Sequence, residues 1–208
     1  MIAVIDYRAG NAPSVGYALE RLGLEHRLAA TAADLDGCDR IVLPGVGAAR
    51  ATLDSLHDSG LVEPIARRVH DDGVPFLGIC IGLQVLFDHS EEGDVDGLGW
   101  VPGRVRRFPD SLRVPQIGWN AVRATRPHPV TDGLGDDAYC YFVNSYFADP
   151  ADAEDALGVT DYGGEFSSIV GRGNVVATQF HAEKSGPLGL SLLTAFSTWE
   201  PAGSEQPC

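Results

Sequence analysis

The sequence predicts an α/β protein with a doubly wound, mainly parallel sheet and an antiparallel extension at one edge of that sheet. Two observations carry this prediction. In the first half of the chain, short runs rich in β-branched residues alternate with longer segments whose apolar residues have helical spacing. From about residue 98 to 176, short apolar runs are instead separated by Gly, Pro and Asp. Alternating strands and helices form βαβ units and parallel sheets, whereas closely spaced strands form hairpins.

The individual elements follow from the same patterns. Predicted strands of the first half span residues 2–6, 25–29, 40–43 and 76–80, and predicted helices span residues 14–22, 49–56 and 62–71. Later strands are predicted at residues 105–108, 119–122, 139–142, 156–160, 167–170 and 175–180, before a closing helix at residues 188–198. There is no internal repeat or linker, so residues 1–199 are predicted to form one domain. The polar tail at residues 200–208, with two prolines, is predicted to be disordered.

The composition argues against several classes of function. The formal net charge is −14 over 208 residues, and an acidic surface repels phosphate backbones, so no nucleic-acid partner is expected. No apolar run approaches a membrane span and the start lacks the basic region of a signal peptide, so we expect a cytoplasmic protein with no membrane partner. The four cysteines are widely spaced without a CxxC pair, which argues against a disulfide framework or a structural zinc site.

Cys80 is the candidate nucleophile. It stands between two glycines in Gly78-Ile79-Cys80-Ile81-Gly82, after an apolar run and before residues 83–87, which have a helical pattern. A nucleophile between small residues at a strand-to-helix turn is typical of an elbow, because the strained turn brings backbone segments close together. The free N–H groups of a following helix would favour the thiolate. For an isolated motif of this kind, a buried structural cysteine is the alternative interpretation.

His181 is the candidate base for that nucleophile. It follows the predicted strand at residues 175–180, and Glu183 comes two residues later. Residues two apart in an extended segment face the same side, so both side chains should project from the carboxyl edge of the sheet, where ligands bind. The predicted arrangement is a Cys80–His181–Glu183 triad in which the carboxylate fixes the imidazole tautomer. A metal site formed by the H-x-E pair and Cys80 is the competing interpretation, although no fourth ligand is evident.

A second pair of glycines occurs in Pro44-Gly45-Val46-Gly47, between a predicted strand and a predicted helix. Acyl transfer requires N–H donors for the developing oxyanion, and glycine permits a peptide orientation that turns an N–H toward the site. Taken alone, this motif predicts only a turn.

Together these motifs resemble those of class I (triad) glutamine amidotransferases. The resemblance lies in GICIGLQ at residues 78–84 and HAEKS at residues 181–185. Within that class the chain is similar to the glutaminase subunits of imidazole glycerol phosphate synthases, through four further segments: IAVIDYRAGN at residues 2–11, PGVG at residues 44–47, PQIGWN at residues 115–120 and YFVNSYF at residues 141–147. The resemblance covers nearly the whole chain except the tail. It implies a flavodoxin-like core and a single glutamine amidotransferase domain.

The resemblance also implies a role for each matching position. Cys80 is the nucleophile, His181 the general base and acid, and Glu183 the orienting carboxylate. The oxyanion hole is formed by the N–H of Val46, once the Gly45–Val46 peptide turns, and by the N–H of Ile81. The residues that contact the substrate glutamine are Gly47, Gln84, Glu92, Asn144, Ser145 and Tyr146, with Gln84 and Glu92 at its α-amino and α-carboxylate ends. The residues that face a partner subunit are Trp119, Asn120 and Lys184.

Two positions depart from the family pattern. Asn144 stands where the family usually has histidine, so the resemblance supports a backbone contact there rather than a side-chain role. Ala49 stands where the family commonly has phenylalanine, which leaves less apolar packing behind the loop at residues 44–47.

The implied reaction is hydrolysis of glutamine to glutamate and ammonia through a glutamyl thioester on Cys80, with His181 as acid and then base. The implied partner is a (β/α)8 barrel cyclase subunit in a heterodimer. It uses the ammonia to make imidazole glycerol phosphate and an aminoimidazole carboxamide ribotide in histidine biosynthesis. No cofactor or metal is implied. The alternatives are a glutaminase of the same class serving pyridoxal phosphate, purine or anthranilate synthesis, a non-catalytic relative, and an unrelated thiol hydrolase or redox sensor.

Overall fold

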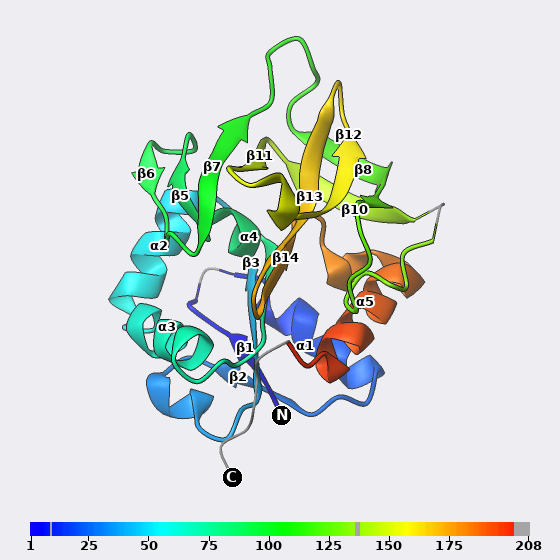
Figure 1. The fold of residues 1–208 in the computed structure, drawn as a ribbon. Coiled ribbons are helices and arrows are strands. Elements are labelled where there is room, and N and C mark those ends of the chain that lie inside the picture. Colours follow the sequence, from blue (N-terminus) through cyan, green and yellow to red (C-terminus); the bar gives the residue numbers. More distant parts are fainter. Residues whose placement is uncertain (9, 136–137, 202–208) are drawn as a thin grey trace.

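A parallel sheet forms the centre of the molecule. The computed structural model describes residues 1–8, 10–135 and 138–201 (Figure 1). Within these residues, twelve strands form one sheet and a two-stranded ribbon stands beside it. The parallel strands lie in the order β2 (His26–Ala29), β1 (Ile2–Ile5), β3 (Arg40–Gly45), β4 (Phe76–Cys80) and β14 (Val175–Thr178). This arrangement confirms the predicted parallel core.

Helices cover both faces of these strands. The longer helices of the described residues are α1 (Ala12–Arg21), α2 (Ala49–Asp58), α3 (Val62–His70) and α5 (Gly186–Thr198). Side chains alternate between the two faces of a strand, so Ala3 and Ile5 of β1 pack with α2 and α3, whereas Ile2 and Val4 pack with α1 and α5. Figure 1 shows the two helix pairs on opposite sides of the sheet. Burial on both faces explains the continuous apolar runs of these strands, and the doubly wound prediction is confirmed.

Mainly antiparallel strands extend the sheet beyond β14, toward the top of Figure 1. In sheet order they are β13 (Glu165–Arg172), β11 (Tyr146–Pro150), β7 (Val101–Arg107), β5 (Phe87–Ser90) and β6 (Val95–Asp96), with β12 (Ala156–Asp161) and β9 (Arg123–Ala124) attached to β13. The separate ribbon pairs β8 (Gln116–Ala121) with β10 (Tyr139–Asn144). The predicted edge extension is confirmed. The patterns missed β5, β6, β9 and β11, which are short or largely polar.

The helix after Cys80 is shorter than predicted. The helical pattern at residues 83–87 is wrong in extent, because α4 (Ile81–Gln84) is a single turn and Phe87 begins strand β5. The reason is tertiary: β5 pairs in parallel with β7, with Phe87 opposite Val101, and both side chains are fully buried. The other short helices of residues 1–8, 10–135 and 138–201 are the 3₁₀ turns η1 (Ala32–Leu35), η2 (Ala153–Asp155) and η3 (Ala182–Lys184).

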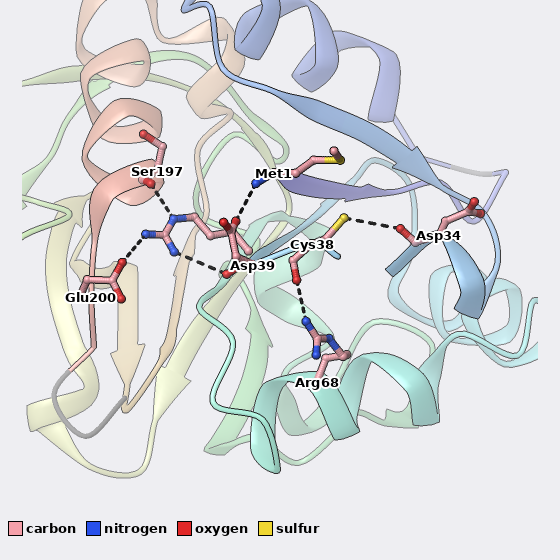
Figure 2. Close-up of polar contacts among 8 residues, drawn as sticks. Met1, Asp34, Cys38, Asp39, Arg68, Ser197 and Glu200 are labelled. Atoms are coloured by element: carbon pink, nitrogen blue, oxygen red, sulfur yellow. Dashed lines mark hydrogen bonds and ion pairs between the residues drawn. The ribbon is translucent and has the colours of Figure 1, made fainter. Parts of the chain in front are cut away.

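At the amino edge of the sheet, Arg40 ties the last helix to strand β3 (Figure 2). Its guanidinium is buried, and Nε donates a hydrogen bond to the Ser197 carbonyl at 2.6 Å while Nη2 contacts Glu200 at 2.8 Å. The N-terminal ammonium pairs with Asp39 at 3.0 Å nearby. Of the tail predicted to be disordered, Glu200 takes part in this contact and residues 202–208 lie outside the described residues.

No helix in the described part of the chain is long and apolar enough to cross a membrane. The described cysteines, Cys38, Cys80 and Cys140, are all buried free thiols.

The Arg40 contacts predict a specific loss of stability. Replacing Arg40 with Ala leaves the part-buried Ser197 carbonyl without its charged donor, so we expect the free energy of unfolding to fall by about 2 kcal/mol. Arg123→Ala is the matched control, because it removes the exposed Arg123–Glu165 ion pair and should cost under about 0.5 kcal/mol. Urea denaturation of both variants makes the comparison. Equal losses would show that the buried Arg40 contacts contribute nothing beyond an exposed ion pair.

Candidate active site

Cys80 lies at the end of β4 in a backbone conformation that side chains rarely adopt, with φ of 58° and ψ of −106°. Its neighbouring glycines have no space for a side chain. A Cβ atom on Gly78 would lie 2.4 Å from the Gly82 carbonyl oxygen, and one on Gly82 would lie 2.0 Å from the Leu43 carbonyl oxygen. The glycine spacing therefore reflects the close backbone approach expected of an elbow. The thiol faces the carboxyl edge of the parallel strands.

His181 and Glu183 meet beyond the end of strand β14. His181 Nδ1 donates a hydrogen bond to Glu183 Oε1 at 2.9 Å, and the two side chains are only 2% and 1% exposed. The local structure differs from the predicted extended segment, because the strand ends at Thr178 and Glu183 lies in the 3₁₀ turn η3. The turn brings the carboxylate back under the imidazole, so the pair forms through a turn and not through the alternation of a strand.

The surroundings of His181 favour its charged form. Burial alone would lower its pKa, but hydrogen bonds with Cys80 and Glu183, together with the attraction of their negative charges, raise the pKa to about 9. At neutral pH the imidazole is therefore an imidazolium between Cys80 and a carboxylate. Since Glu183 can only accept, the Nδ1 proton points at the carboxylate and Nε2 is left for Cys80.

Asn11 donates to the same carboxylate oxygen of Glu183 that accepts from His181. Its Nδ2 donates to Glu183 Oε1 at 2.6 Å, across 172 positions of sequence. Sequence reasoning missed this residue. An asparagine just before Ala12 and Pro13 is typical of a helix cap, yet the Asn11 side chain makes no capping hydrogen bond to α1. Its amide is used by Glu183 instead, so Asn11 belongs to the site.

A pocket of about 240 Å³ opens beside Cys80 and His181. Most of the residues expected to bind glutamine or an oxyanion line this pocket. Those that do are Val46, Gly47, Ile81, Gln84, Glu92, Asn144, Ser145 and Tyr146. Pro115 and Val143 also line it and were not predicted. Gly45 lies behind the pocket, opposite Cys80 in the register of β3 and β4. A Cβ on Gly45 would lie 2.5 Å from the Tyr7 hydroxyl, so glycine is required there for space as well as for flexibility.

Glu92 and Asn144 are two polar side chains that line the pocket. Glu92 accepts the Ala49 N–H at 2.7 Å, and burial raises the pKa of its carboxyl group while this hydrogen bond opposes the rise. Asn144 Nδ2 donates to the Tyr146 carbonyl at 2.9 Å, whereas its Oδ1 is buried without a partner among the described residues. The side chain at position 144, where the resemblance supported only a backbone contact, is therefore held by the Tyr146 carbonyl and keeps its oxygen buried.

A family model described as glutamine amidotransferase class-I matches residues 3–197. The chain belongs to this family. The resemblance drawn from the motifs at residues 78–84 and 181–185 is thereby confirmed.

Several relatives of this class-I glutamine amidotransferase carry the same name. The imidazole glycerol phosphate synthase subunit HisH of Syntrophotalea carbinolica is 47% identical over 204 residues, covering 94% of this chain and 98% of the relative. HisH of Desulfitobacterium hafniense strain Y51 is 44% identical over 200 residues, covering 96% of this chain and 94% of the relative. Among solved structures, a crystal structure of glutamine amidotransferase matches with a TM-score of 0.75 at 19% identity, covering 95% of this chain and all of that chain. The structure of PurLQS from Thermotoga maritima matches with a TM-score of 0.74 at 19% identity. The match covers 94% of this chain and 96% of that chain. These two structures support the amidotransferase fold.

The residues expected at a partner interface lie on the surface of this amidotransferase, next to the pocket. Trp119 is 56% exposed on strand β8, Asn120 Nδ2 donates to the Asp161 carbonyl at 2.9 Å, and Lys184 is exposed on η3. The ribbon that carries Trp119 exposes further apolar side chains on the same face, namely Ile117, Tyr139 and Val143. Val143 also lines the pocket, so the apolar face and the candidate active site are continuous.

The competing metal interpretation finds no support in the site. In the part of the chain that the structure describes, no group of three or more histidine, cysteine, aspartate or glutamate side chains is arranged to hold a metal ion.

The raised pKa of His181 predicts how stability depends on pH. The folded-state pKa is about 9, above the ordinary value of about 6.5. Stability from this group is therefore fully present below about pH 6.5 and is lost as the pH rises through about 9. We expect the unfolding free energy of the wild-type chain to fall relative to that of His181→Gln between about pH 6 and pH 10. Urea titrations across this range measure the difference. A constant or growing advantage of the wild type would contradict the assigned protonation.

Proposed function

We propose that this chain is the glutaminase subunit of an imidazole glycerol phosphate synthase. The observation that carries the proposal is the meeting of a thiol on a strained elbow, an imidazolium and a buried carboxylate at one end of a small pocket. The pocket volume of about 240 Å³ lies just below the range of about 300–1,000 Å³ typical of drug-sized ligands, which suits an amino-acid substrate. The HisH relatives named above match nearly the full chain and supply the assignment within the class.

The proposed chemistry is acyl transfer to Cys80. The thiolate attacks the side-chain amide carbon of glutamine, and His181 gives its Nε2 proton to the leaving nitrogen, which departs as ammonia. The neutral imidazole then takes a proton from water, which attacks the thioester carbon and releases glutamate with regeneration of the thiolate. Glu183, held by Asn11, keeps the Nδ1 proton in place through both steps.

Two backbone N–H groups would stabilise the tetrahedral oxyanion. One is that of Ile81, which begins α4 directly after the nucleophile. The other is that of Val46, after rotation of the Gly45–Val46 peptide. Losing one oxyanion donor typically lowers the rate by about 10²–10³, so the orientation of this single peptide is enough to control hydrolysis. Docking of a partner beside the pocket would bias that orientation.

The acceptors of the pocket support one orientation of the substrate. Both hydrogens of Gln84 Nε2 are engaged, by the Tyr146 carbonyl at 3.1 Å and by Gln179 Oε1 at 3.0 Å. Gln84 therefore offers only its Oε1 to a ligand, and the carboxylate of Glu92 lines the same pocket. These two acceptors suit the α-ammonium group of glutamine. We place the α-carboxylate against backbone N–H groups near Gly47 and Ser145.

The apolar face of the ribbon is the proposed docking surface for the partner. Monomeric proteins rarely leave large apolar side chains grouped in this way, and aromatic anchors are typical of protein interfaces. The partner would be a (β/α)8 barrel cyclase subunit, forming a heterodimer in the cytoplasm. Since the face borders the pocket, ammonia released at Cys80 could enter the cyclase before it is protonated in bulk water.

Cys80→Ala tests the proposed chemistry. With the cyclase subunit and its acceptor substrate present, we expect glutamate release to fall by on the order of 10⁴ or more, because the nucleophile is removed from an elbow that remains folded. Cys38→Ser, at a buried thiol on the amino side of the sheet, should keep most of the activity.

The same assay tests the partner. Amide ¹⁵N from glutamine should appear in imidazole glycerol phosphate when the cyclase is present. Glutaminase activity without such transfer would keep the glutaminase assignment and overturn the assignment to this synthase. Substantial activity in Cys80→Ala would overturn both.

A further inference from the structure

A chain of buried amides connects the nucleophile to the wall of the pocket. Gln179 is fully buried just beyond the end of β14, two residues before His181. Its Nε2 lies 3.9 Å from Cys80 Sγ, and its Oε1 accepts a hydrogen bond from Gln84 Nε2 at 3.0 Å. Gln84 Nε2 also donates to the Tyr146 carbonyl at 3.1 Å. The sulfur of Cys80 is thus contacted by an amide as well as by the imidazole of His181.

The direction of this chain is fixed by a backbone group. A side-chain amide can point either its oxygen or its nitrogen at a neighbour, and the hydrogen-bond network must decide between them. The Tyr146 carbonyl can only accept, so Gln84 must turn its nitrogen toward it. The second hydrogen of that nitrogen meets the oxygen of Gln179. The nitrogen of Gln179 is therefore left facing the sulfur, as an N–H donor.

We propose that Gln179 is a further catalytic residue, whose amide N–H stabilises the thiolate of Cys80 and which is held in that orientation by Gln84 and the Tyr146 carbonyl. The proposal rests on the proposed function, in which Cys80 is the nucleophile. Hydrogen bonds to the charged form of a group favour that form. An N–H on the sulfur favours the attacking thiolate, and it favours the thiolate again as the leaving group when water cleaves the thioester.

Gln84 is a positioning residue in this arrangement. It contacts the pocket with its oxygen and orients Gln179 with its nitrogen. A ligand that donates a hydrogen bond to Gln84 Oε1 therefore changes the orientation of Gln84, which holds Gln179 against the sulfur. Occupation of the pocket is thereby coupled to the charge of the Cys80 sulfur.

Two substitutions separate this role from simple packing. Gln179→Leu removes the donor and keeps much of the volume. Gln179→Glu keeps the shape, but it replaces the N–H by a carboxylate oxygen that repels a thiolate. If Gln179 only fills space, the leucine variant should leave the pH dependence of Cys80 reactivity unchanged. If it donates to the sulfur, the glutamate variant should be the more severe one.

The measurement is the pH dependence of alkylation of Cys80 by iodoacetamide in the full-length chain, followed by mass spectrometry of the Cys80 peptide. For Gln179→Leu we expect the midpoint of reactivity to rise by about one pH unit, with a tenfold fall in kcat/KM in the complex with the cyclase. Gln179→Glu should raise the midpoint further. Asn174→Ala is the matched control, because Asn174 is an amide at the opposite end of β14 that donates to the Val69 and Val74 carbonyls. Its midpoint should equal that of the wild type.

Unchanged midpoints in both Gln179 variants, or a larger shift in the leucine variant than in the glutamate variant, would overturn the proposal. If Gln179→Leu does not fold, Gln179→Met decides in its place, because methionine has a similar length and volume and no N–H donor. Failure of the proposed function is a separate result. It would appear as a wild-type complex that releases no glutamate, whatever the midpoints of the variants.

Discussion

The strained backbone of Cys80 is the constraint on which the rest of the candidate site depends. A cysteine at φ of 58° and ψ of −106° costs on the order of 1–3 kcal/mol, and such a conformation persists only where the surroundings determine it. Here the surroundings are two glycines that allow the Gly82 backbone to pass against the Leu43 carbonyl. The strands on either side of the elbow, β3 and β14, are buried on both faces. The core therefore stabilises a turn that would be unfavourable by itself, and the turn exposes the sulfur to the pocket.

The elbow also determines which groups can reach the sulfur. Strand β4 lies between β3 and β14, so the chain segments that leave these two neighbours must pass beside Cys80. From β3 comes the loop with Val46 and Gly47, and from β14 come Gln179 and His181. The two sides carry different chemistry, since the first offers backbone N–H groups for an oxyanion and the second offers the groups that govern the charge of the thiol. The parallel strands alone bring these groups together at Cys80. The connection between β10 of the ribbon and β11 of the antiparallel extension forms the far wall of the pocket.

The sequence predicts the parallel core, its flanking helices and the family. Burial on both faces of a strand produces a continuous apolar run, and a close backbone approach requires glycine, so both patterns can be recognised within a few consecutive residues. The sequence does not predict contacts that depend on distant segments. The Asn11–Glu183 hydrogen bond joins residues 172 positions apart, and the Gln179–Cys80 contact joins residues 99 positions apart. His181 and Glu183 do lie in contact, as predicted. The predicted local structure is wrong, since a 3₁₀ turn replaces the expected extended segment. The extent of the helix after Cys80 was predicted wrongly because the pairing of β5 with β7 overrides a local helical pattern. The catalytic roles themselves stay predictions.

The central claim of this account is that glutamine is cleaved through a thioester on Cys80. The most direct measurement is partition of that intermediate with hydroxylamine, which competes with water for an acyl group whether or not the intermediate accumulates. Addition of hydroxylamine to the complex with glutamine should yield γ-glutamyl hydroxamate, at the expense of glutamate and with ammonia release maintained. The product should be absent when Cys80 is replaced by alanine. Ammonia release that proceeds with glutamate as the sole acyl product at every hydroxylamine concentration would contradict the account.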